Sequence, residues 1–577
     1  MNSGGSDPVE IYLNEYRQKF AKATTDFLNN AVRSAGVDSA ANAALSLEID
    51  SLIAERGLKN KQKNRWVFLL TFLVIAFLAW GGFIWYSVSN SIFISITHWC
   101  CFVGFSLFCV FFLALKCIPK ILDISRVIKE LNNSISGKIS EAKEQLRPFF
   151  AMFEWNTVTK LIEKTVPQLK FDDFLPASRI RDLCSNFDFS FDSMGFKSVL
   201  YTHSGTFCGY PFVFLNTKVF SWGTKTYYGH KTISWRVRVR GADGKTHVIE
   251  RSEVLTASVT KPVPEFSEEK SLLFGHDAAP RLVFSREPSR LSGAQDSFFA
   301  NLGKKAKLRK LHRLAQNMTD DSDFTMMSNR DFEVLFNSTD RNNEIEYRLL
   351  FTPLAQQHMV NLLNDTKTGY GDDFWYQKDE KITQIVSKHL ASLNFSTAPF
   401  VPDEYNLIKI MQIFFAQYTE FFRSIYFSFA PLFTIPLYNE QRPASASAEY
   451  DVGSNDNKIS AWEMESIANY QGESHYAHAE SITGNLLQVH DVQHSGNKTS
   501  ARVSAYGFKG KNHSEYISVF GGDGRTHRVR VDWVEYIGVK KISELDAYDS
   551  RAGKPDDAES RHGIRRRSTI SFLPHGW

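Results

Sequence analysis

The chain has 577 residues, which is more than one hydrophobic core normally serves, so two or three domains are expected. Hydrophobic residues make up 43% and charged residues 23%, the balance of a folded protein, and a net charge of +4 does not indicate that the chain as a whole binds nucleic acid. The six cysteines show no zinc-finger or CxxC spacing, and four lie in or beside one apolar region, a pattern that predicts reduced thiols inside a cell and no disulfide framework.

The first 65 residues have the spacing of amphipathic helices. A second apolar stripe of this kind lies at residues 44–55. The first stripe consists of Tyr12, Tyr16, Phe20, Phe27 and Leu28. Residues 1–65 are therefore predicted to be a cytosolic helical segment.

Two long uncharged runs follow, at residues 66–86 and 93–115. Each is long enough to cross roughly 30 Å of hydrocarbon, which predicts a transmembrane helical hairpin over residues 66–117; a pair of buried core helices is the less favoured interpretation. Basic residues flank the pair and are absent from the short turn between the runs: Lys59, Lys61, Lys63, Arg65, Lys116, Lys120 and Arg126. The positive-inside rule then puts both termini in the cytoplasm, at the inner membrane if the source is a bacterium.

The hairpin is expected to act as an anchor. His98 is the only ionisable side chain within its two runs, whereas transport paths usually carry several such groups. A pore formed by several copies remains an alternative.

Residues 118–170 are predicted to form a helical stalk with a coiled-coil-like seam. The seam consists of Ile121, Ile124, Ile128, Leu131, Ile135, Ile139, Ala142 and Leu146. It can pack on the protein's own body, or residues 121–146 can pair with a protein partner or a second copy; packing within the chain is favoured.

Residues 171–440 are predicted to be a cytosolic α+β domain with antiparallel β-meanders. In TISWRVRVRG, Trp235, Val237 and Val239 alternate with Arg236, Arg238 and Arg240. This period of two predicts a strand with one buried face and one basic, solvated face.

A basic amphipathic helix is predicted at residues 296–316. Its leucines recur at helical spacing beside six cations: Lys304, Lys305, Lys307, Arg309, Lys310 and Arg313. Such a helix can lie on anionic lipid, and a solvated surface helix is the alternative; nucleic-acid phosphates are a less favoured partner.

The rest of this domain alternates short apolar runs with polar turns. Residues 332–336 and 345–351 are predicted to be strands, Thr352 is predicted to cap a helix that begins at Pro353, and residues 405–438 are predicted to be a buried core helix. Residues 441–460 have the composition of a linker. The polar residues 546–577, with Arg565, Arg566 and Arg567, are predicted to be a disordered basic tail.

An internal repeat marks the second half of the chain. GADGKTH (241–247) and GGDGRTH (521–527) match at five of seven positions, and strand patterns flank both. A phosphate-binding loop would need a glycine at position 239, which is valine, and a helix after the motif. Both copies are therefore predicted to be hairpin turns, and residues 461–545 a second β-rich repeat region. The copies can pair in one sheet or belong to separate modules.

Catalytic chemistry has weak candidates only. His475, His478 and His490 lie in a histidine-rich region and could bind zinc for a metal-dependent hydrolase, although turn histidines are the simpler interpretation. Asp372 and Asp373 could be paired carboxylates but are more typical of an acidic loop. Because no hydrolase or kinase signature is present, no catalytic residue and no cofactor is predicted.

Several stretches resemble a bacterial family of membrane proteins of unknown function, which have an N-terminal two-helix hairpin and a cytosolic α/β domain. The similar stretches are residues 204–220, 224–266, 332–363, 426–438 and 463–470, with RLLFTPLAQ the most specific. The resemblance implies the topology and the order of the parts, and no functional residue.

These observations predict a membrane-anchored cytosolic binding or scaffold protein that acts at the inner leaflet. Whether it is also an enzyme stays open, and a non-catalytic role is favoured. The alternatives are a membrane-tethered metal-dependent hydrolase and an oligomeric membrane pore or effector. The expected partner is the lipid bilayer, and nucleic acid is not expected; sequence does not identify a ligand, a protein partner or an oligomeric state.

Overall fold

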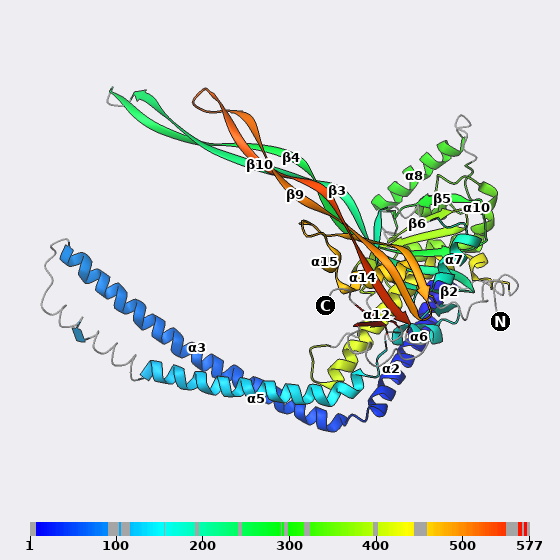
Figure 1. Ribbon diagram of the computed structural model, residues 1–577, viewed down its shortest axis with the longest axis horizontal. Helices are drawn as coiled ribbons and strands as arrows, with labels where there is room; N and C mark the ends of the chain where they lie inside the picture. The colour runs from blue at the N-terminus through cyan, green and yellow to red at the C-terminus, as the bar shows by residue number, and fades with distance from the viewer. Residues whose placement is uncertain are drawn as a thin grey trace. The chain divides into compact units, whose positions relative to one another are not determined.

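The protein is described by a computed structural model (Figure 1). Its described residues are 7–89, 103–104, 116–154, 156–190, 196–240, 245–289, 291–292, 298–316, 324–395, 402–443, 458–549, 564–567 and 570–573. The chain forms two compact units. Unit 1 contains Met1–Thr24, Glu154–Ala398 and Tyr418–Trp577, and unit 2 contains Thr25–Phe153 and Pro399–Gln417.

Unit 2 is helical, as the apolar spacing predicts. Its elements include most of α2 (Arg17–Ser34), all of α3 (Ser39–Ser89) and α5 (Ile118–Phe150), and the start of α12 (Leu407–Phe433). Helices α3 and α5 run antiparallel, and Leu45, Ile49 and Ala142 form the core between them. Since Ala142 belongs to the predicted seam, this part of the seam packs within the chain.

Helix α3 continues beyond this packing into its apolar half. Within it, Ser39–Gly82 is the one described helical segment that is long and apolar enough to cross a membrane. Its large side chains are exposed at Val67, Phe68, Phe72, Val74, Ile75, Leu78, Trp80, Trp85 and Tyr86. The second predicted span, residues 93–115, lies outside the described residues except for Val103 and Gly104.

Unit 1 is a mixed α+β structure with two antiparallel sheets, which confirms the predicted fold class at this level. The first sheet has the strand order β1-β2-β3-β4-β7-β6-β5. Its strands are β1 (Leu169–Phe171), β2 (Lys197–Phe207), β3 (Tyr210–Arg240), β4 (Thr246–Gly275), β5 (Val283–Arg286), β6 (Phe374–Asp379) and β7 (Ile382–Ser387).

The second sheet has the strand order β11-β12-β10-β9-β8. Its strands are β8 (Leu486–Ser495), β9 (Lys498–Phe520), β10 (Thr526–Asp549), β11 (Ile564–Arg567) and β12 (Ile570–Leu573). The predicted disordered tail is thus strand where it is described, because β12 pairs with the end of β10.

The N-terminal residues belong to unit 1 and pack on the second half of α12. Tyr12 and Phe20 are buried, and the Phe20 ring stacks on Phe422 with centroids 4.2 Å apart. The Tyr426 hydroxyl donates a hydrogen bond to the Pro8 carbonyl at 2.7 Å. These residues come from α1 (Pro8–Ile11), the π-helical turn η1 (Tyr12–Tyr16) and α2. The predicted core helix at residues 405–438 is therefore confirmed for this half.

Two long hairpins, β3–β4 and β9–β10, project from the body of unit 1 and pack on each other (Figure 1). Together they are called the β-arm, which comprises residues 221–265 and 509–537. Its core contains Ile233, Leu255, Ala257, Val529 and Val531. At about 3.3 Å per residue, the roughly 20 residues of β3 beyond Phe220 span about 65 Å.

The β-arm contains both copies of the repeat. The second copy is a hairpin turn, as predicted: Gly521 and Arg525 close it, with the Gly521 N–H 2.8 Å from the Arg525 carbonyl, and Gly524 has φ of +78°. Residues 241–244 of the first copy lie outside the described residues. The two copies lie in different sheets whose hairpins pack together, which decides the arrangement that sequence left open.

Helix α14 (Ala461–Gln471) lies between the two sheets in the body. Its apolar residues join the core of the second sheet, while Trp462 joins the core of the first. The buried Glu465 accepts hydrogen bonds from the backbone N–H groups of Val199 (2.5 Å) and Val489 (3.0 Å), one from each sheet. This helix therefore links the two sheets.

Unit 1 contains further helices. They are α6 (Thr157–Thr165), α7 (Ala177–Asn186), α8 (Phe298–Gln316), α9 (Arg330–Phe336), α10 (Glu344–Leu350), α11 (Pro353–Asn364), η4 (Lys388–Ser392), η5 (Pro436–Asn439) and α15 (Glu473–Tyr476). Thr352 caps α11, as predicted, by accepting from the Ala355 N–H.

Two predicted strands are helices. Residues 332–336 belong to α9 and residues 345–350 to α10, because Asn329 and Asn343 cap them by accepting from backbone N–H groups three residues ahead. The periodicity of a short apolar run does not distinguish a buried helix from a strand. In these two segments the asparagine caps favour the helix.

Strand β4 contains two prolines, Pro262 and Pro264. Strand β4 continues through them, since in the arm it pairs only with β3 and its other edge needs no N–H donors.

Candidate functional site

The predicted basic strand face lies near the end of the β-arm. Arg236, Arg238 and Arg240 are exposed on β3. The β9–β10 turn reaches as far as Trp235, whose ring lies beside Gly522, and Glu253, whose carboxylate accepts from the Gly522 N–H at 2.7 Å. The described residues 236–240 and 245–252 therefore extend beyond the second hairpin.

This uncovered ribbon also exposes apolar side chains. Val248 is 60% exposed and Ile249 is 46% exposed. In the register, Val248 lies opposite Arg238 and Glu250 opposite Arg236, so the arginine face is basic with apolar and acidic neighbours. A surface of this kind suits a contact with an anionic partner.

The predicted basic helix exists as α8, but its apolar stripe is covered. Leu308, Leu311 and Leu314 pack against Phe324 and Val334. Four of its cations are exposed, while Lys304 and Lys307 are half-buried: the exposed ones are Lys305, Arg309, Lys310 and Arg313. These three leucines are thus engaged inside the protein, while Leu302 is exposed beside the charges of α8.

Lys307 of α8 has a pKa below its usual value. Burial and the neighbouring Arg286 lower its pKa, and Asp372 opposes them. Lys307 therefore belongs to a semi-buried charge cluster and contributes less than its neighbours to a surface contact.

The histidine candidates do not converge. His475 and His490 are exposed, and the His478 ring accepts a hydrogen bond from the Glu480 N–H within its own turn. Within the described residues, no group of three histidine, cysteine or acidic side chains is arranged to hold a metal ion.

The two aspartates of the GYGDDFWY stretch have separate partners. Asp372 forms a buried ion pair with Arg286, with 2.5 Å between its Oδ1 and the arginine Nη2. Asp373 accepts from the His389 ring at 2.6 Å, and the other ring nitrogen lies 3.0 Å from the Ser428 hydroxyl.

Asp373, His389 and Ser428 form a hydrogen-bonded series like the Asp-His-Ser triad of a serine hydrolase. The surroundings of these three residues differ from those of an active site. Ser428 is fully buried in α12, and its hydroxyl donates to the Ser424 carbonyl at 2.8 Å. The Tyr370 ring stacks on His389 at 4.0 Å. These hydrogen bonds fasten α12 to the loop before β6.

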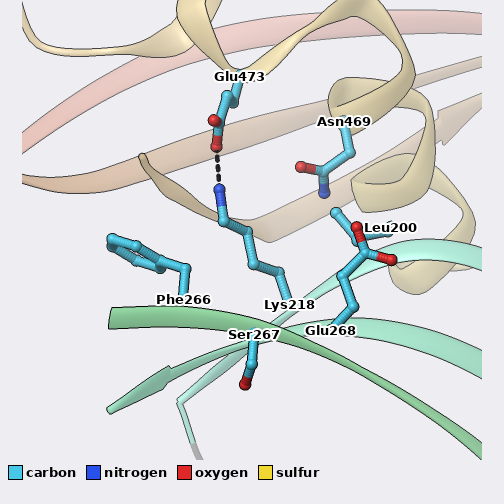
Figure 2. A pocket seen from close by; sticks show the side chains of 7 residues that line it. All are labelled: Leu200, Lys218, Phe266, Ser267, Glu268, Asn469 and Glu473. Atoms are coloured by element: carbon cyan, nitrogen blue, oxygen red, sulfur yellow. Dashed lines mark hydrogen bonds and ion pairs between the residues drawn. The ribbon is translucent and has the colours of Figure 1, made fainter. Parts of the chain in front are cut away.

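A pocket of about 300 Å³ lies where the β-arm meets the body (Figure 2). Lys218 of β3 extends across it to form an ion pair with Glu473 of α15, and its Nζ lies 4.9 Å from the centre of the Phe266 ring. Asn469 of α14 and Glu268 of β4 line it as well. The pair ties α15 to the first sheet, and Glu473 also accepts from the N–H of Asn485, the residue before β8 of the second sheet, at 3.0 Å.

An adjoining pocket of about 240 Å³ shares Phe266 with the first and is mostly aromatic. It lies between the two sheets at the base of the β-arm. Its lining residues are Phe196, Phe220, Phe266, Leu486, Tyr506, Gly507, Phe508, Gly538, Val539 and Lys540. This lining includes one cation and no carboxylate. The aromatic pocket, defined by these residues, is the more apolar of the two pockets.

Sequence analysis missed both pockets. The alternation Asn216, Lys218, Phe220 on β3 was a detectable signal, since period two places these side chains on one face of a strand. The opposite wall comes from residues some 290 positions later, and no local pattern indicates which face of the second sheet would meet it.

No protein-family model, curated protein or solved structure matches this chain. The family resemblance therefore stays a prediction.

Proposed function

We propose that this chain is a membrane-anchored binding protein whose unit 1 lies entirely on the cytoplasmic side. The observation that carries the proposal is the exposed apolar surface of α3 from Val67 to Tyr86. Soluble proteins rarely leave a continuous apolar surface of this length in water, whereas a bilayer covers it favourably.

The packing of unit 1 supports a hairpin anchor. Residues 7–24 precede α3 in the chain, whereas the residues that they contact come after α3. Asn361 donates a hydrogen bond to Asp7 at 2.6 Å, and the Phe20 ring stacks on Phe422. One compact unit cannot be assembled from segments on opposite sides of a bilayer. If α3 crosses the membrane, the chain crosses it an even number of times, and residues 93–115 are the apolar run that provides the return.

The first prediction concerns this topology. The full chain, expressed in a bacterium, is expected to resist alkaline carbonate extraction, and epitope tags at the two termini are expected to be inaccessible to protease in intact spheroplasts but accessible after lysis.

A replacement of Phe72 and Ile75 by lysine should release a large fraction of the protein from the membrane, since each central lysine costs about 2.5–3.5 kcal/mol on insertion. The same replacement at the exposed Leu47 and Leu58 is the control. Tags found on opposite sides, or a wild-type chain removed by carbonate, would contradict the proposal.

The contact surface of the binding protein is proposed to be the basic ribbon of the β-arm, residues 236–240 and 245–252, and its partner an anionic lipid surface. Three exposed arginines alternate along β3, with exposed Val248 on their face of the ribbon and exposed Ile249 on the opposite face. Cations attract the headgroups, and short apolar side chains can enter the interfacial region. Helix α8 is the weaker candidate because Leu308, Leu311 and Leu314 are engaged in packing.

The second prediction separates these two surfaces. The full chain in zwitterionic nanodiscs is expected to float with vesicles that contain anionic phosphatidylglycerol, and not with phosphatidylcholine vesicles. Arg236→Glu with Arg238→Glu should weaken this association by about thirtyfold or more, at about 1 kcal/mol for each cation lost. The matched control is Lys305→Glu with Arg309→Glu on α8. Loss in the α8 variant alone would transfer the contact to α8, and equal flotation with both vesicle types would refute an anionic partner.

The hydrolase and pore alternatives have distinct readouts. Bound zinc in the purified full chain would favour a metal-dependent hydrolase, and voltage-dependent conductance in planar bilayers would favour a pore. The geometry of the described residues gives neither alternative a specific supporting observation.

A further inference from the structure

The aromatic pocket at the base of the β-arm has the composition of a ligand site. Phe220 and Phe266 form its wall on the first sheet, with ring centroids 5.8 Å apart. Tyr506 and Phe508 form its wall on the second sheet, and Phe220 stacks on Phe508 at 5.3 Å. Rings from both sheets therefore surround a space that neither sheet fills.

A missing side chain makes this space. Gly538 of β10 lies directly opposite Phe508 in the ladder, and a Cβ built at Gly538 would meet no atom within 4 Å. By contrast, a Cβ at Gly507, which also lines the pocket, would lie 2.3 Å from Asn485 and Ser481. Gly538 therefore borders open room, while Gly507 permits a close contact within the protein.

The edge of the pocket provides a ring and a charge. The Phe196 ring meets Tyr506 edge to face at 5.0 Å and is 49% exposed, so it forms part of the rim. Lys540 lies opposite Tyr506 in the ladder, with its Nζ 4.9 Å from the ring centre. It is the only charged residue in the lining.

We propose that the aromatic pocket binds a small aromatic carboxylate, with the ring over Gly538 between the phenylalanine walls and the carboxylate on Lys540. The cavity of about 240 Å³ suits a single ring with a short side chain. Stacked and edge-on rings favour an aromatic guest over an aliphatic one of equal size. A lining with one cation and no carboxylate selects an anion. This ligand site does not depend on the membrane anchor.

Gly538 provides a direct way to block the site. Its surroundings leave room for a larger side chain, and its backbone lies outside the left-handed region, so Gly538→Leu should fill the pocket without strain. Gly538→Ala is a graded variant that occupies less of the same space. Lys540→Met removes the charge and keeps the length of the side chain, and Lys511→Met, at an exposed position outside the pocket lining, is the matched control.

The test uses 3-(4-fluorophenyl)propionate as the probe and the neutral 3-(4-fluorophenyl)propanol as its partner. Fluorine NMR titrations are made on the full chain in nanodiscs, with empty nanodiscs as the baseline for partition into lipid. The wild-type chain is expected to bind the carboxylate saturably and more tightly than the alcohol. Gly538→Leu should abolish saturable binding of both probes. Lys540→Met should weaken the carboxylate by about fivefold and leave the alcohol unchanged, and Lys511→Met should match the wild type.

Several outcomes would overturn the proposal. Saturable binding that survives Gly538→Leu would place the ligand elsewhere, and equal losses for both probes in Lys540→Met would remove the charge selection. Absence of saturable binding to the wild-type chain would refute an aromatic carboxylate at this site. A folding defect in Gly538→Leu would show as a lowered thermal transition by circular dichroism; Gly538→Ala and Lys540→Met then decide the question.

Discussion

Glu465 is a buried acid whose ionisation should be linked to the stability of unit 1. Burial raises its pKa to about 8, and the Val199 and Val489 N–H donors oppose this shift without overcoming it. The folded chain therefore keeps the proton up to about pH 8, whereas the unfolded chain releases it near pH 4.5. Between these values the folded state binds more protons, so the stabilising effect is full below about pH 4.5 and is lost as pH rises towards 8.

The third prediction follows from this linkage. In the full chain in nanodiscs, the free energy of unfolding of the wild type should fall between about pH 5 and 8, by up to about 1.4 kcal/mol per pH unit from this group. Glu465→Gln should flatten that dependence, although it loses one of the two backbone hydrogen bonds and is less stable at pH 5. The exposed Glu480→Gln is the control. Urea unfolding followed by circular dichroism measures the effect, and parallel wild-type and Glu465→Gln profiles would contradict it.

Sequence analysis could not identify Glu465. In EMESIANY two acids flank a methionine in a helix, and an acid on a helix is ordinarily solvated. Here Glu463 is also buried and accepts from Leu175 N–H at 3.1 Å and from the Thr202 hydroxyl at 2.9 Å. Three of the four donors named for these acids, Leu175, Val199 and Thr202, lie more than 260 positions earlier in the chain than the acid they contact. Only the fold brings them to the acids.

The β-arm, as an element, depends on close contact between two hairpins. Gly229 of β3 permits the closest approach, since a Cβ there would lie 1.9 Å from the Arg530 carbonyl oxygen. Lys261 adds an ion pair with Glu515 at 2.8 Å and lies 4.3 Å above the Trp533 ring. Backbone packing, rather than side-chain charge alone, therefore sets the spacing of the hairpins.

The fourth prediction compares two glycines of the same strand. Gly229→Ala should push the hairpins apart at a cost of about 1–3 kcal/mol, the usual range for overpacking against a wall that cannot move. Gly223→Ala is the matched control, because the atoms it would meet are the end of the flexible Glu265 side chain. Limited trypsin digestion is expected to cut the arm of Gly229→Ala much faster than that of the wild type or Gly223→Ala. Equal cleavage of all three would show that the hairpins are not held at Gly229.

At the level of elements, sequence predicted what depends on local pattern. Alternating Arg236 and Val237 predicted a strand, and the repeated Asp-Gly motif predicted paired turns. The lengths of β3 and β4, with Pro262 inside β4, were not predictable, because a strand continues only where another strand meets it. The helices α9 and α10 were missed because asparagine caps outweighed the strand-like composition of their apolar residues.

At the level of the whole molecule, chain order and spatial organisation differ. Sequence analysis placed residues 1–65 in one helical segment, whereas residues 7–24 pack in unit 1 and the residues after Thr24 belong to unit 2. The aromatic residues that decide this, Tyr12 and Phe20, have the same helical spacing as Phe27 and Leu28, which lie in the other unit. Periodicity predicts that a face is buried, and it does not identify the partner that buries it.

The fifth prediction tests the role of the N-terminal segment in unit 1. Phe20 is 1% exposed and stacks on Phe422, so Phe20→Ala should leave a cavity in the aromatic core that joins the two ends of unit 1, at a cost of about 3–5 kcal/mol. The neighbouring Lys19→Ala, which loses only an exposed contact with Glu15, should leave the free energy of unfolding nearly unchanged. Urea unfolding of the full chain in nanodiscs, followed at the β-sheet signal, measures both.

If Phe20→Ala unfolds as the wild type does, the N-terminal helix is not part of unit 1, and the requirement for an even number of membrane crossings loses its basis. If it unfolds early while the chain stays in the membrane, a segment encoded before the anchor stabilises sheets encoded after it, and both must then reside on the same side of the bilayer.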